Sequence, residues 1–179
     1  MKYKINNQSI IKEDHITKPN EDGWELNLIR YKTEENYKNP VILCHGLAAN
    51  KHSTDFGEIN EPEWLKYSLA SYLSLSKNDE KLSFDCWVAQ LRGRGKKITF
   101  NPENNPEKYE WCVDDYIEKD VPSIVNYIKN WYLTNKKYTP KIFWIGKSMG
   151  GMIGYAYAQT YEGKKKSKRT NYNWFSNSI

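Results

Sequence analysis

The chain has 179 residues, 39% of them hydrophobic and 27% charged, with a formal net charge of +5. This length and balance favour one globular domain over a disordered chain or two domains. Much of the excess positive charge lies in residues 164–169, outside the expected hydrophobic core. We therefore expect no nucleic-acid partner, because a basic tail is not a binding face of the domain.

No segment has the about 20 consecutive apolar residues that cross a bilayer, and the first residues lack the apolar core of a signal peptide. The three cysteines, Cys44, Cys86 and Cys112, are too few and too scattered for a disulfide framework or a metal site. These features predict a cytoplasmic protein.

The first predicted strand covers residues 24–31, which alternate apolar and polar side chains over most of their length and should be half-buried. Residues 40–44 form a continuous apolar run that ends at a His-Gly pair, as is typical of a strand buried on both faces of a parallel sheet. A helix is predicted over residues 62–75. Its apolar stripe comprises Trp64, Leu65, Leu69, Tyr72 and Leu73.

The next buried strand is predicted at residues 84–89, and it stops at the Arg-Gly-Arg-Gly sequence of residues 92–95. Residues 96–109 are polar and rich in proline and asparagine, which predicts a loop.

A second helix is predicted after this loop, because apolar residues recur at helical spacing over residues 117–128. Asp115 and Glu118 have the spacing of a helix-capping pair. Pro122 interrupts the pattern. It either kinks the helix or lies in its first turn, with Asp120 as the cap.

Residues 141–145 form a third buried strand, and a helix follows through about Tyr161. Between them, residues 146–150 read Gly-Lys-Ser-Met-Gly, the pattern G-x-S-x-G. Small residues around Ser148 permit a sharp strand-to-helix turn that presents the hydroxyl above the carboxyl edge of the sheet, with a positive or strained φ. A phosphate-binding P-loop is excluded, because it needs a glycine where Lys141 stands.

Strands alternating with helices indicate a parallel α/β sheet. The order of the motifs over about residues 24–161 resembles the α/β-hydrolase family, and four segments resemble its lipase and esterase members: residues 41–49, 87–95, 114–122 and 144–153. The resemblance implies Ser148 as the nucleophile, the backbone amides of Leu47 and Met149 as the oxyanion hole, and neither a metal nor an organic cofactor. It also implies a structural role for His45.

Two features depart from that family. Its triad runs in the order serine, acid, histidine, whereas all three histidines of this chain precede Ser148 and only one acid, Glu162, follows it. Lys147 stands where the family often has histidine or another polar residue. It either favours a carboxylate on the substrate or is an exposed lysine at the rim of the pocket.

We therefore expect the N-terminal part of an α/β-hydrolase fold, a mostly parallel sheet flanked by helices with the C-terminal strands missing. Residues 1–163 should form this partial domain, and residues 164–179 a basic tail that is disordered or non-native, for example an out-of-frame extension.

Three functional hypotheses stay open. In the first, the chain is a serine hydrolase for small apolar or lipid-like esters, incomplete because the acid and histidine of the triad are absent. In the second, it is a non-catalytic remnant or binding module. In the third, it is half of a split hydrolase that a second chain completes. The exposed edge of the sheet would bind that second chain or drive self-association.

Overall fold

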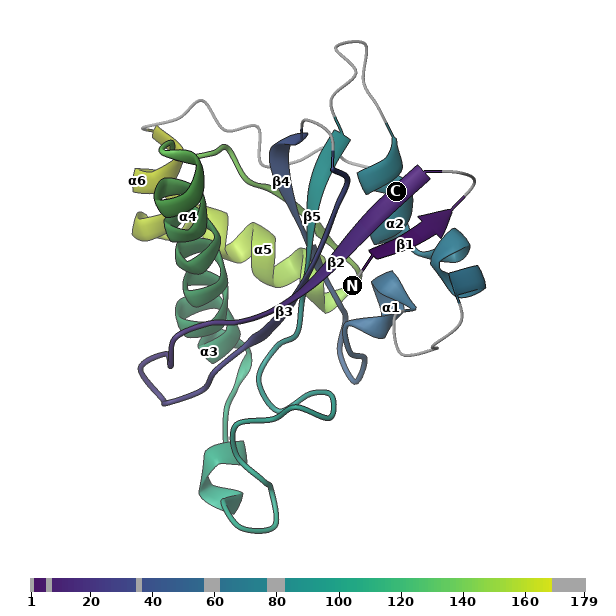
Figure 1. Cartoon of the computed structure of the whole chain (residues 1–179). Helices are drawn as coiled ribbons and strands as arrows, with labels where there is room; N and C mark the ends of the chain where they lie inside the picture. The colour runs from purple at the N-terminus through teal and green to yellow at the C-terminus, as the bar shows by residue number, and fades with distance from the viewer. Residues whose placement is uncertain (1, 6–7, 35–36, 57–61, 77–82, 169–179) are drawn as a thin grey trace.

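The computed structural model describes residues 2–5, 8–34, 37–56, 62–76 and 83–168 (Figure 1). Within them lies a six-stranded sheet of order β1-β2-β3-β5-β4-β6. The bounds of its strands are β1 Lys2–Ile5, β2 Gln8–Ile16, β3 Asn27–Lys32, β4 Tyr37–Cys44, β5 Ser83–Ala89 and β6 Phe143–Gly146. Strand β4 pairs in parallel with β5 and β6, whereas β1, β2, β3 and β5 pair antiparallel in succession. The sheet is therefore mixed, with its parallel part at β5, β4 and β6.

Helices cover both faces of this sheet (Figure 1). The α-helices are α1 His52–Asp55, α2 Leu69–Leu75, α3 Val113–Asp115, α4 Val121–Lys136, α5 Met149–Gln159 and α6 Tyr161–Lys168. Two 3₁₀ turns, η1 Pro62–Tyr67 and η2 Pro106–Tyr109, and one π-helical turn, η3 Tyr116–Asp120, complete the elements.

Two hydrophobic cores form because successive side chains of a strand point to opposite faces. In β4, Ile42 and Cys44 face the core beneath α4 and α5, whereas Val41 and Leu43 face the core beneath α2. The continuous apolar run of this strand is thus explained by burial on both faces, as predicted.

The N-terminal part of the sheet was not predicted. Strands β1 and β2 form an antiparallel pair, and β2 continues the sheet by pairing with β3. The strand predicted over residues 24–31 is observed as β3, but the prediction that it is half-buried was wrong, because the four residues 28–31 are all buried. One of them is Arg30, whose guanidinium pairs with the buried carboxylate of Asp85.

The predicted helix over residues 62–75 is broken at Ser68, whose hydroxyl accepts a hydrogen bond from Ser71 N–H at 3.2 Å and caps α2. The break changes which side chains face the sheet, so the predicted apolar stripe was wrong. Three of its members are exposed, namely Trp64, Leu69 and Tyr72. Leu65 is the member of the stripe that is buried, and the buried positions of α2 are Ala70, Ser71 and Ser74.

The start of the second predicted helix differs as well. Asp115 does not pair with Glu118 as a cap, but accepts a hydrogen bond from Cys112 N–H at 2.8 Å as the third residue of α3. Pro122 lies in the first turn of α4, as one of the two alternatives predicted. Asp120 precedes it without capping the helix, because its carboxylate binds Arg92.

A further helix follows α5, where none was predicted. Helix α6 begins after Thr160, whose hydroxyl accepts a hydrogen bond from Gly163 N–H at 3.0 Å. Residues 164–168, the start of the expected tail, belong to α6, and residues 169–179 lie outside the described residues. None of the described helices is long and apolar enough to cross a membrane.

Candidate active site

Ser148 lies in the two-residue turn between β6 and α5 and has a strained backbone conformation, with φ 52° and ψ −122°. The strained φ predicted from the sequence is thus confirmed. The turn requires glycine at position 146, because a β-carbon there would lie 2.2 Å from backbone atoms of Gly150 and Gly151. The side chain of Ser148 is exposed, so its hydroxyl is open to a substrate.

Helix α5 packs unusually close to the sheet behind this turn. A β-carbon on Gly150 would lie 2.5 Å from the carbonyl oxygen of His45, and one on Gly154 would lie 2.3 Å from the indole of Trp144. The same indole donates a hydrogen bond of 2.8 Å to the carbonyl of Gly150. These contacts fix the N-terminus of α5 against the ends of β4 and β6.

The loop after β4 runs beside Ser148. A β-carbon on Gly46 would lie 3.3 Å from Ser148 Cβ and 3.0 Å from the carbonyl of Lys147. Within the described part of the chain, the amides of Leu47 and Met149 have no hydrogen-bond partner. The structure therefore places the loop that carries Leu47 beside the turn that carries Ser148 and Met149.

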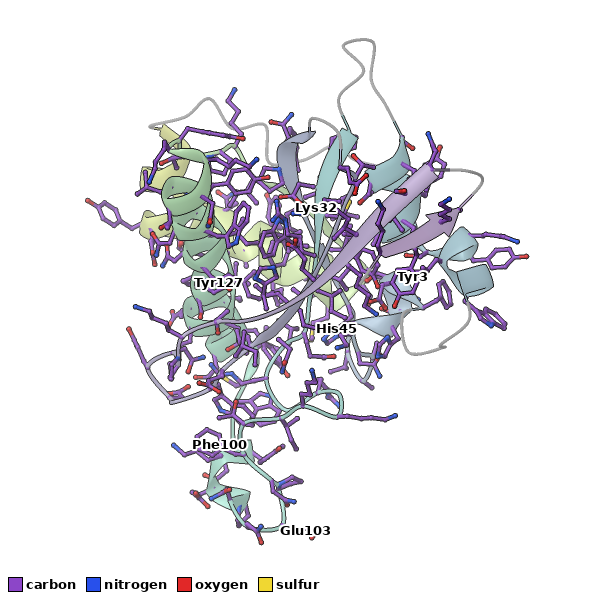
Figure 2. All side chains as sticks on the ribbon, viewed as in Figure 1. Tyr3, Lys32, His45, Phe100, Glu103 and Tyr127 are labelled. Atoms are coloured by element: carbon purple, nitrogen blue, oxygen red, sulfur yellow. The ribbon has the colours of Figure 1, made fainter. Side chains whose placement is uncertain are left out.

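His45, labelled in Figure 2, holds this loop in place and is buried. Its Nε2 accepts a hydrogen bond of 3.2 Å from Leu91 N–H, so Nδ1 carries the proton and donates to the carbonyl of Gly46 at 2.9 Å. Burial lowers the pKa of His45, which keeps the ring neutral. Gln90 lies 3.0 Å from the same Nε2 and accepts a hydrogen bond from Lys51 N–H, which ties the two ends of the loop together.

The other two histidines are also held away from Ser148. His52 Nδ1 lies 3.0 Å from Asp55, whose second oxygen accepts a hydrogen bond from Tyr31 on β3. The Asp55 carboxylate of this pair is thus bound to a side chain of β3, and β5 and β4 separate that strand from β6 in the sheet. His15 contacts Tyr127 on α4. Among the residues described, no hydrogen bond joins the Ser148 hydroxyl to an imidazole or a carboxylate.

The family model described as alpha/beta hydrolase fold matches residues 39–168. The chain belongs to the α/β-hydrolase family. A probable lipase of Schizosaccharomyces pombe is 29% identical over 154 residues, which are 80% of this chain and 30% of that protein. A tear acid lipase-like protein of Mesocricetus auratus is 30% identical over 141 residues, 74% of this chain and 31% of that protein. The chain thus spans about a third of the length of these relatives.

Solved structures agree on the fold. An esterase of Pyrococcus furiosus superposes with a TM-score of 0.52 at 19% identity, over 86% of this chain and 49% of that one. An α/β-hydrolase of Novosphingobium aromaticivorans superposes with a TM-score of 0.51 at 19% identity, over 86% of this chain and 41% of that one.

In this member of the α/β-hydrolase family, Arg92 forms ion pairs that the sequence did not reveal. Arg92, from the Arg-Gly-Arg-Gly segment, binds Asp120 through both its backbone N–H, at 3.0 Å, and its Nε, at 2.9 Å, and binds Asp22 at 2.7 Å. The guanidinium thereby ties the loop after β5 to the start of α4. The only signal in the sequence was the position of Arg92 directly after a buried strand.

No cluster of three or more His, Cys, Asp or Glu side chains among the described residues has the geometry to hold a metal ion.

Proposed function

We propose that this α/β-hydrolase cleaves small apolar or lipid-like carboxylic esters through Ser148. The observation that carries the proposal is the conformation of Ser148, with φ 52°, between a buried strand and a helix. Such strain persists only where the surrounding structure enforces it, and it concentrates at functional sites. The lipase-like relatives support the ester class of substrate.

In the proposed reaction, Ser148 Oγ attacks the ester carbonyl carbon while its proton passes to an imidazole base. The carbonyl oxygen becomes an oxyanion, which the amides of Leu47 and Met149 stabilise at the N-terminus of α5. Collapse of this intermediate releases the alcohol, which takes the proton from the imidazolium. Water then attacks the acyl-serine with the same base, releasing the acid and restoring the hydroxyl.

In this proposal the imidazole comes from outside these 179 residues. The partners of the three histidines support it, because each of them contacts a residue other than Ser148. We propose that a further polypeptide segment carrying an acid and a histidine docks beside β6. This strand is the edge of the described sheet, and Ile145 on it is 41% exposed. Nearby on α5, Met152 is 70% and Tyr155 55% exposed, which leaves an apolar surface for the segment to cover.

Hydrolysis of a series of p-nitrophenyl esters tests this proposal. The wild-type chain and Ser148→Ala are assayed alone and together with the C-terminal part of a lipase-like relative. We expect turnover by the complemented wild type, at most a slow rate by the chain alone, and none above background with Ser148→Ala. Equal rates for wild type and Ser148→Ala in every arm would favour the second candidate, a binding module that keeps the fold without the chemistry.

A further inference from the structure

Two cationic residues of the loops that follow the parallel strands have no assigned role. Lys147 directly precedes Ser148 and is exposed. Arg94 lies in the loop after β5 and is half-exposed. Lys147 belongs to the Gly-Lys-Ser-Met-Gly motif and Arg94 to the Arg-Gly-Arg-Gly motif. The reaction proposed above assigns no role to either side chain.

Neither of these two side chains has a counter-ion among the residues that the structure describes, unlike Arg92 and Lys119. Arg92 pairs with Asp120 at 2.7 Å, and Lys119 pairs with Asp115 at 2.8 Å. By contrast, the side chains of Lys147 and Arg94 form no ion pair or hydrogen bond with any residue that the structure describes. The positive charge beside Ser148 is therefore not neutralised by these parts of the protein.

The topology places both cations on the same edge of the sheet. Strands β5, β4 and β6 are adjacent and parallel, so the loops that follow them meet at one edge. Arg94 follows β5, the Gly46–Leu47 loop follows β4, and Lys147 follows β6. Figure 1 shows the loop after β5 and the first turn of α5 at this edge, and Figure 2 shows His45 there.

We propose that the ester cleaved at Ser148 carries an anionic group, a carboxylate or a phosphate, which Lys147 and Arg94 bind on either side of the Gly46–Leu47 loop. This inference rests on the proposed function and narrows its substrate class to amphiphilic esters with one charged end. A guanidinium offers paired donors that fit a carboxylate or phosphate, and an ammonium adds a point charge. Uncompensated cations around a site also raise the local concentration of anionic substrates.

Binding of non-hydrolysable amide analogues tests the inference without requiring catalysis. The three analogues share one acyl chain and end in a carboxylate, a phosphate or a neutral primary amide, and their affinities are measured by calorimetry on the full chain. We expect at least one anionic analogue to bind about tenfold more tightly than the neutral one at low salt, with a preference that shrinks as salt is added. The carboxylate and phosphate arms identify which anion is preferred.

Three variants assign that preference to the two residues. Lys147→Gln and Arg94→Gln should each weaken the anionic analogue about fivefold, the effect of one exposed ion pair, without changing the neutral one, and Arg94→Lys should retain most of the affinity. Lys141→Gln, at the opposite end of β6, should change nothing. Equal affinity for all analogues, an equal effect of Lys141→Gln, or no binding of any analogue would overturn the inference. Failure of Ser148 to react, with the anion preference intact, would instead count against the proposed function.

Discussion

The α-carbon of Gly150 lies so near the carbonyl of His45 that a β-carbon there would stand 2.5 Å from that oxygen. Gly150→Ala should therefore push α5 away from β4. The overpacking costs about 1–3 kcal/mol, which outweighs the up to about 1 kcal/mol that alanine gains over glycine in a helix. We expect a lower free energy of unfolding in urea and weaker reactivity of Ser148.

Met152→Ala is the matched control for this prediction, because Met152 lies in the same helix and is largely exposed. Its stability should stay within about 0.5 kcal/mol of wild type. A Gly150→Ala chain as stable as Met152→Ala would show that α5 does not need its close contact with the sheet.

The buried pair of Arg30 and Asp85 should be far more sensitive to substitution than a surface pair. Arg30 Nε lies 2.7 Å from Asp85, and both side chains are fully buried. Arg30→Met leaves a buried carboxylate without its counter-ion, which should cost about 3–5 kcal/mol of unfolding free energy. Lys2→Met removes the exposed Lys2–Glu34 pair and should cost no more than about 1 kcal/mol. Similar losses in the two variants, measured by urea unfolding, would contradict this account of the Arg30 pair.

Stability should fall as the medium is acidified below neutral pH, because burial lowers the pKa of His45. The unfolded chain takes up a proton at the ordinary pKa of about 6.5, while the folded chain does so only at lower pH. The contribution of His45 is therefore complete above about pH 6.5 and is lost as the pH falls through its folded pKa, by at most about 1.4 kcal/mol per pH unit. Urea unfolding between pH 7.5 and 5 should show a smaller pH slope for His45→Asn than for wild type. Identical slopes would mean that His45 is not held neutral.

The sequence predicted the parts of the site whose signals are local. Strands β4, β5 and β6 contain short, mainly apolar runs, and the turn at Ser148 is marked by flanking glycines. The burial of Arg30 was not predicted, because Arg30 looks like the polar member of an alternating strand. The carboxylate that permits its burial, that of Asp85, lies 55 residues further along the chain. Strand β2 was missed because its core residue, Ile10, stands in a segment of otherwise mixed and partly exposed residues. Whether a polar group is buried depends more on partners that are distant in the sequence than on the local pattern of residues.

The edge strand β6 should make the isolated chain self-associate or lose solubility. The side chain of Ile145 on this strand is 41% exposed. The outer side of an edge strand also presents backbone N–H and C=O groups without partners in the sheet. Sedimentation velocity over a range of concentrations should show association that Ile145→Lys reduces and that a fragment supplying further strands removes. A monomeric wild-type chain with a sharply cooperative melt would mean that the edge is already covered.

Labelling with a fluorophosphonate, followed by peptide mass spectrometry, tests the central claim that Ser148 is the nucleophile of this site. We predict that the adduct forms on Ser148, that Ser148→Ala abolishes it, and that adding a segment with the missing acid and histidine accelerates it. Labelling of the chain alone would favour a self-sufficient hydrolase, and labelling only with the added segment would favour a split one. An adduct on another serine, or none on Ser148 in any arm, would contradict the assignment.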